Sequence, residues 1–139
     1  MSQLTSLQRN EEETLATVRL TGALARQVVS ALSDEYSSRI LVSTVTKGKT
    51  VQEISLEQAI PLSSCYRKAD ELVEQGLLVV ERVIVTMEGK RYAVYRSTFK
   101  GVKTTSDFGA TTVSAELNAD VAEKFRSKWS CLNFNSDRR

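Results

Sequence analysis

The sequence predicts one α+β domain, with its helices in the first half of the chain and its strands in the second. From residue 22 to 75, apolar residues recur at the three- and four-residue spacing of amphipathic helices. From residue 78, β-branched residues gather in short runs separated by glycine-containing turns. The 139 residues, 41% hydrophobic and 26% charged, suffice for one core with an appendage and exclude a second full-sized core.

Two helices are expected first, over residues 22–32 and about 34–46. The first carries Leu24, Ala25, Val28, Val29 and Leu32 at helical spacing. Ser33-Asp34 supplies an N-cap for the second, and the Lys47-Gly48-Lys49 run ends it with a glycine where positive φ is favoured. The buried stripe expected for this second helix is Tyr36, Ile40, Leu41, Thr44 and Val45.

Two more helices follow, over about 51–58 and 62–75. Thr50 and Glu53 form a capping box at the start of the shorter one, which turns Val51, Ile54 and Ser55 inward. Pro61 ends that helix and suits the first position of the next, which Gly76 stops. The buried residues expected in the longer helix are Leu62, Cys65, Ala69, Leu72 and Val73.

The rest of the chain predicts two β-hairpins and a last helix. The first hairpin has strands at about 78–87 and 92–99 around Glu88-Gly89-Lys90, and the second has strands at about 101–106 and 111–117. Val113, Ala115 and Leu117 alternate onto one face of the second. Asn118 caps a helix over about 119–132, whose apolar stripe is Ala122, Phe125, Trp129 and Leu132.

Composition excludes several classes of protein. The chain has no histidine, and its two cysteines, Cys65 and Cys131, are far apart. Histidine-dependent triads, common zinc sites and a disulfide framework are therefore excluded or disfavoured. No glycine-rich phosphate loop or activated nucleophile indicates an enzyme, and no cofactor is expected. The polar N-terminus and the absence of a long apolar run predict a cytoplasmic protein without membrane contact.

Three helices followed by a hairpin match the order of elements in a winged helix-turn-helix domain. Residues 31–41, ALSDEYSSRIL, resemble the first helix of ArsR-like regulators. Residues 60–68, with the ELVEQGLL run after them, are similar to the recognition helix in the archaeal branch of that family, and Gly89-Lys90-Arg91 with Tyr95-Arg96 resembles the wing. The resemblance covers about residues 23–99. The expected division is an N-terminal arm (1–21), a winged helix-turn-helix domain (22–99) and a hairpin-plus-helix appendage (100–139).

The resemblance implies a dimeric transcriptional regulator that binds double-stranded DNA. Its helix at about 62–75 would enter the major groove, and its wing, about 87–91, would contact flanking DNA. Family sensors often bind metal through a cysteine pair in the second helix, but residues 51–57 contain no cysteine, so no metal is expected.

Helical geometry turns one polar face of residues 62–75 outward. Arg67 is the best candidate for bidentate contact with guanine, whereas Lys68 is better placed for a phosphate. The full set of predicted DNA contacts is Ser63, Ser64, Tyr66, Arg67, Lys68, Lys90 and Arg91. Residues 61–103 carry eight basic and five acidic side chains, and this local positive charge favours phosphate contact.

Alternatives remain open for each of these features. The polar face and charged turn can be solvated surface, and the winged helix can instead be a protein–protein interaction module of a larger assembly without specific DNA binding. The apolar stripe of residues 119–132 fits a homodimer interface, with intramolecular packing as the alternative. Cys65 fits a small buried hydrophobe better than a redox sensor. The 101–117 hairpin can line a ligand pocket or extend a dimer interface, and the effector, if any, is unknown.

Overall fold

The computed structural model describes residues 17–107 and 109–122, which form an α+β fold with small antiparallel sheets. Its elements are β1 (Thr17–Leu20), α2 (Gly22–Ser33), α3 (Glu35–Ser43), α4 (Val51–Gln58), α5 (Leu62–Glu74), β2 (Leu78–Val85), β3 (Arg91–Ser97), β4 (Phe99–Asp107) and β5 (Ala110–Leu117). Strands β2 and β3 form one two-stranded sheet, and β1, β5 and β4, in that order, form the other. None of the helices in this part of the chain is long and apolar enough to cross a membrane.

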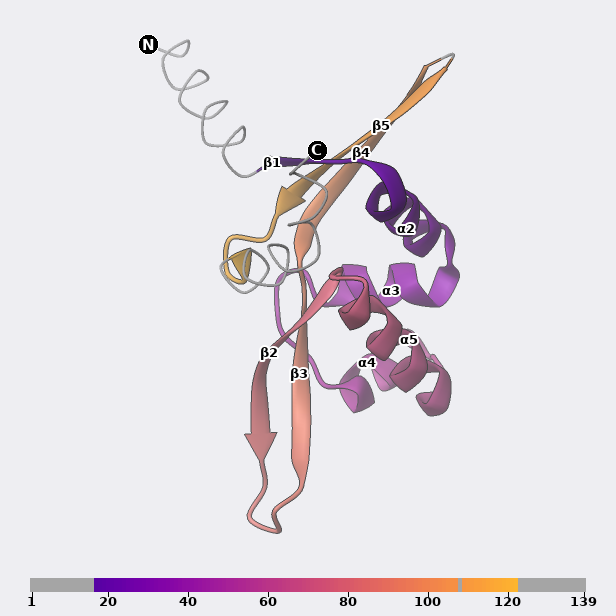
Figure 1. The fold of residues 1–139 in the computed structure, drawn as a ribbon. Coiled ribbons are helices and arrows are strands. Elements are labelled where there is room, and N and C mark those ends of the chain that lie inside the picture. The colour runs from indigo at the N-terminus through magenta and orange to yellow at the C-terminus, as the bar shows by residue number, and fades with distance from the viewer. Residues whose placement is uncertain (1–16, 108, 123–139) are drawn as a thin grey trace, which may run out of the picture.

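The two hairpins extend from opposite ends of the molecule. In Figure 1, β2–β3 runs downward past α4 and α5, and β4–β5 runs upward past α2. Strand β4 continues almost in line with β3, separated from it only by Thr98. Lys49, in the loop between α3 and α4, forms an antiparallel bridge with Tyr95, which fastens this loop to the first hairpin.

The four helices predicted between residues 22 and 75 and the four strands of the two predicted hairpins are confirmed, and Thr17–Leu20, in the expected arm, forms a further strand. The signals predicted for the start of α4 and the end of α5 are both present. Thr50 and Glu53 form the full capping box at the start of α4, and Gly76, after the C-cap Gln75 of α5, adopts φ 82°. Gly89 adopts φ 85° in the turn of the first hairpin, the left-handed region that glycine enters at least cost.

The helix expected over about 34–46 is shorter than predicted. It ends at Ser43, and Thr44 is its C-cap. The Thr44 hydroxyl donates to the Ile40 carbonyl at 2.9 Å, while the Thr44 carbonyl accepts from the Ser97 backbone N–H at 3.0 Å. Bonds between Thr44 and Ser97 on β3 therefore take the place of the last helical turn that was expected up to residue 46. This is a contact between distant parts of the chain, which no local sequence pattern indicates.

Leu62 is a second correction. It was expected on the buried stripe of its helix, but 47% of its surface is exposed. The buried face of α5 begins one turn later, at Cys65, and continues through Ala69 and Leu72. Leu62 lies at the start of α5, directly after the turn from α4. The side chains of this helix reach the core only from Cys65 onward.

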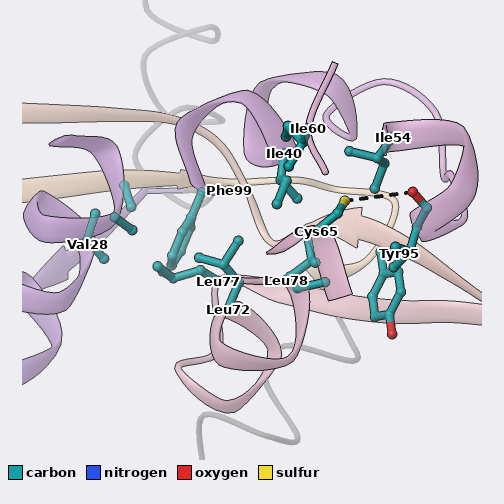
Figure 2. Close-up of a cluster of buried hydrophobic side chains, with 14 of the residues drawn as sticks. Val28, Ile40, Ile54, Ile60, Cys65, Leu72, Leu77, Leu78, Tyr95 and Phe99 are labelled. Carbon is teal, nitrogen blue, oxygen red and sulfur yellow. Dashed lines mark hydrogen bonds between the residues drawn. The ribbon is translucent and has the colours of Figure 1, made fainter. Parts of the chain in front are cut away.

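The core is one cluster to which both halves of the chain contribute. It joins helical residues such as Val28, Ile40 and Leu72 to residues of the strands such as Leu20 and Leu117. Figure 2 shows part of it, with Val28 at one end and Tyr95 at the other. Strand β1, from the expected arm, and β5, from the expected appendage, therefore pack on the same core as the helices, and they pair with each other.

Three predictions lie wholly or mostly outside the described residues: the N-terminal arm at 1–21, of which 1–16 are not described, most of the helix at 119–132, and Cys131. Of the expected apolar stripe at the C-terminus, Ala122 is half-buried against the core, whereas Phe125, Trp129 and Leu132 lie outside the described residues.

Candidate nucleic-acid interface

Helix α5 has one apolar and one polar face, as its sequence pattern predicts. Cys65, Ala69 and Leu72 are at most 1% exposed and anchor the helix. The Cys65 backbone N–H donates to the Pro61 carbonyl at 2.9 Å, so helical bonding starts at the proline. On the other face, Ser63 and Arg67 are exposed, and Ser64 is half-buried.

Arg67 is an exposed cation on the polar face of this helix. Among the described residues it has no hydrogen-bond or ion-pair partner. A guanidinium presents five N–H donors in a planar fork that matches a phosphate or the O6 and N7 edge of guanine. Arg67 can therefore bind such an acceptor without breaking an interaction inside the described part of the protein.

Lys68, one position along, is already paired. Its Nζ lies 3.4 Å from Asp34 Oδ2 at the N-cap of α3 and 3.8 Å from Glu71 Oε2. The Ser37 backbone N–H donates to Asp34 at 3.0 Å, and this bond, followed by the Ser37 side chain and Lys68, holds the pKa of the Asp34 carboxyl below its ordinary value. A phosphate would have to compete with two carboxylates for Lys68.

Tyr66 connects the two helices of the candidate helix-turn-helix. It is 41% exposed, and its hydroxyl accepts a hydrogen bond from Gln52 Nε2 on α4 at 2.6 Å. Its oxygen keeps its own hydrogen for another acceptor. Tyr66 can thus orient α5 on α4 and still donate outward.

The turn of the first hairpin presents two further cations. The Thr86 backbone N–H donates to the Lys90 carbonyl at 2.9 Å, and the Thr86 hydroxyl accepts from the Lys90 backbone N–H at 3.1 Å. These bonds fix the backbone of the turn, while the side chains of Lys90 and Arg91 are exposed. Neither forms an ion pair with another residue that the structure describes.

The base of the same hairpin holds a buried arginine. Arg96 is 6% exposed and donates to the Val45 carbonyl at 3.0 Å, to Glu81 Oε1 at 3.2 Å and to Asp120 Oδ2 at 2.6 Å. The Glu81 carboxylate lies against Gly48, where an added Cβ would be 2.1 Å from Oε2. Arg96 therefore ties β2, β3, the α3–α4 loop and the segment after β5 together.

Cys65 shows no sign of a reactive thiol. It is fully buried, its Sγ lies 3.7 Å from the Val51 carbonyl oxygen, and burial raises the pKa of the thiol (Figure 2). A protonated, enclosed thiol is a poor nucleophile and a poor metal ligand. Among the described residues, no three acidic or thiol side chains gather in a way that could hold a metal ion.

The seven predicted DNA contacts thus fall into two groups. Ser63, Tyr66, Arg67, Lys90 and Arg91 are exposed, whereas Ser64 and Lys68 are half-buried. In Figure 1, α5 lies to the right of the β2–β3 hairpin, and the hairpin turn projects below it. The sequence predicts Asp34 as an N-cap, which the structure confirms. It does not predict the pairing of Asp34 with Lys68, the bond between Gln52 and Tyr66 or the partners of Arg96, because these partners are distant along the chain and no local motif marks such pairs.

No protein-family model matches the chain, and a search of curated proteins finds no significant match.

Proposed function

We propose that this protein is a winged helix-turn-helix regulator that binds double-stranded DNA in a sequence-specific manner. In this proposal α3, α4 and α5 form the helical core, α5 is the recognition helix in the major groove, and the β2–β3 hairpin is the wing on flanking DNA. The order and spacing of the elements support it, as does the resemblance of residues 23–99 to ArsR-like regulators.

The observation that carries the proposal is the pairing state of the basic side chains. Arg67 on α5 and both Lys90 and Arg91 in the hairpin turn are exposed and have no partner among the described residues. Arg96 and Lys68, in contrast, are held by carboxylates. Arg67, Lys90 and Arg91 lie on the face and the turn that would meet DNA, and they are available for phosphates and base edges.

Each residue then has a distinct role. Arg67 reads a guanine, and Ser63, in the first turn of α5, donates to a phosphate near the positive end of the helix dipole. Lys90 and Arg91 bind the backbone or the minor groove beside it. Lys68 contributes less than its charge suggests, because Asp34 and Glu71 already neutralise it.

Selection of bound duplexes from a random pool by the full chain tests this function. We expect a recovered consensus of two inverted half-sites one helical turn apart, as a symmetric dimer requires. Binding to that duplex should weaken with added salt and still prefer the consensus at each salt concentration. Recovery of no consensus, with no duplex binding at low salt, would contradict the proposal.

One observation favours a second function, that of a protein–protein interaction module. The outer half of β2 and the turn after it expose apolar side chains, with Val83, Val85 and Met87 at 52%, 60% and 106% exposure. DNA backbone contact does not require these residues, whereas a protein partner could bury them. A duplex selection without a consensus would leave this alternative as the better explanation of the hairpin.

A further inference from the structure

An apolar pocket opens between α2, α3 and β4, away from the residues assigned to DNA. Its volume is about 130 Å³. Val28, Leu77 and Phe99 form its buried floor and lie close together at one end of the core cluster (Figure 2). Leu32 and Val42, which are 40% and 71% exposed, form part of its rim.

The size of the pocket limits what it can hold. A dry protein cavity of about 150 Å³ lined by leucine, isoleucine and phenylalanine binds benzene. The pocket described here has similar walls and nearly that volume. It therefore fits one six-membered ring or a branched alkyl group of the same size.

Among the described residues that line the pocket, one is charged, and it is the cation Lys100. Lys100 is exposed and has no hydrogen-bond or ion-pair partner among the described residues. The other described residues that line it are apolar or glycine. A ligand that matches both features has a small apolar body for the cavity and one negative charge for the Lys100 ammonium.

We propose that this pocket binds small apolar carboxylates, with the ring or alkyl group between α2, α3 and β4 and the carboxylate beside Lys100. The proposal concerns a site separate from α5 and the hairpin turn, so it stands or fails independently of DNA binding.

Titration of the full chain with sodium benzoate tests it, with the methyl groups of Val and Leu followed by NMR. We expect saturable shifts at Val28, Leu32 and Val42, and no such shifts with acetate, which has the charge without the ring. Benzyl alcohol, which has the ring without the charge, should bind about two- to fivefold more weakly, the size expected for an exposed ion pair.

Two pairs of variants separate the apolar and the ionic part of the site. Val42→Trp should fill the pocket and abolish benzoate binding, whereas Leu56→Trp, at an exposed leucine on α4, should leave it unchanged. Lys100→Gln should weaken benzoate about two- to fivefold and leave benzyl alcohol unaffected. Lys103→Gln, which removes the same charge from the same strand outside this pocket, should change neither. Thermal midpoints check that each variant folds.

Several results would overturn the proposal. The absence of methyl shifts at the pocket would do so, as would benzoate binding that survives Val42→Trp in a folded protein. If benzoate and benzyl alcohol bind equally well and Lys100→Gln changes neither affinity, Lys100 does not bind a carboxylate and the proposed ligand class is wrong. If benzoate does not bind and the chain self-associates through contacts that Val42→Trp abolishes, the pocket is an interface between two copies instead.

Discussion

The base and the turn of the β2–β3 hairpin belong to the same two strands but have opposite surroundings. At the base, Leu78 and Val94 are at most 1% exposed, and Arg96 is enclosed by three acceptors. Near the turn, Val85 and Met87 are exposed, and Lys90 has no ion-pair partner in the described part of the chain. One end of the hairpin is part of the folded core, and the other end is available for contact with another molecule.

The same difference separates neighbouring residues on α5. Lys68 is paired with Asp34 and Glu71, and Arg67 is unpaired among the described residues. Paired cations hold elements together, and unpaired cations remain for a ligand. The stability of the protein should therefore depend on the paired groups and not on the exposed ones.

The largest effect is expected from Arg96→Ala. It leaves the Glu81 carboxylate and the Val45 carbonyl without their bonds from Arg96, so the free energy of unfolding should fall by about 3 kcal/mol. Urea denaturation measures it. Arg82→Ala, at an exposed arginine farther along β2, is the control and should change stability by less than about 0.5 kcal/mol. Equal losses in both variants would contradict the distinction between base and turn.

Gly48→Ala should have the next largest effect. Its new Cβ would lie 2.1 Å from Glu81 Oε2 and 2.7 Å from Val94 Cγ1, so the carboxylate must leave its position beside Arg96. We expect a loss of about 1–3 kcal/mol by the same measurement. Gly101→Ala is the matched control, because a Cβ there meets no atom within 4 Å. A destabilised control with an unchanged Gly48 variant would refute the described packing.

Asp34→Asn separates the charge of Asp34 from its capping role, since asparagine also caps helices. The pKa of Asp34 is lowered in the folded state, so its charge stabilises the protein above the ordinary value of 3.8, and this stabilisation is lost as pH falls through the folded pKa. At pH 7 the free energy of unfolding of the wild type should exceed that of the variant by less than about 1 kcal/mol, because Asp34 is partly exposed. Urea denaturation at several values between pH 7 and pH 2.5 measures this difference in free energy of unfolding, which should shrink toward the acid end. A difference that stays constant or grows as the pH falls would exclude an ionic contribution of Asp34.

The smallest effect on stability is expected at the turn. Met87→Gln should change the free energy of unfolding by less than about 0.5 kcal/mol, because its side chain is fully exposed within the described part of the chain. A matched substitution at a buried position, Leu78→Gln, should lower the free energy of unfolding by about 1–3 kcal/mol. If Met87→Gln were strongly destabilising, the turn would be part of the core rather than a free surface.

Local patterns in the sequence predicted the elements because helical spacing, capping and glycine turns act over a few residues. Thr50 and Gly76 illustrate this, since each has its expected conformation or bond. The end of α3 and the exposure of Leu62 were predicted wrongly. Both depend on which parts of the chain meet in the folded protein, and in the case of α3 this is the bond from Ser97 to Thr44.

In the candidate interface, too, the local pattern of α5 could be predicted and the contacts between distant residues could not. The amphipathic pattern of α5 places Arg67 outward, as observed. The pairing of Lys68 with Asp34 spans thirty-four residues of sequence, and the Arg96 partners Val45 and Asp120 lie 51 and 24 residues away, so no local motif could show them. The apolar pocket likewise combines residues of α2, α3 and β4.

The most direct test of the proposed function compares Arg67→Ala with Arg26→Ala, each measured by fluorescence anisotropy on the selected duplex and on a shuffled duplex. Arg26 is also exposed and lies on α2, so both variants lose one positive charge. We predict that Arg67→Ala weakens binding to the selected duplex by about 1–3 kcal/mol, changes binding to the shuffled duplex far less, and so reduces the preference. Arg26→Ala should keep the preference intact. Equal effects of the two variants on both duplexes would contradict the assignment of α5 as the recognition helix.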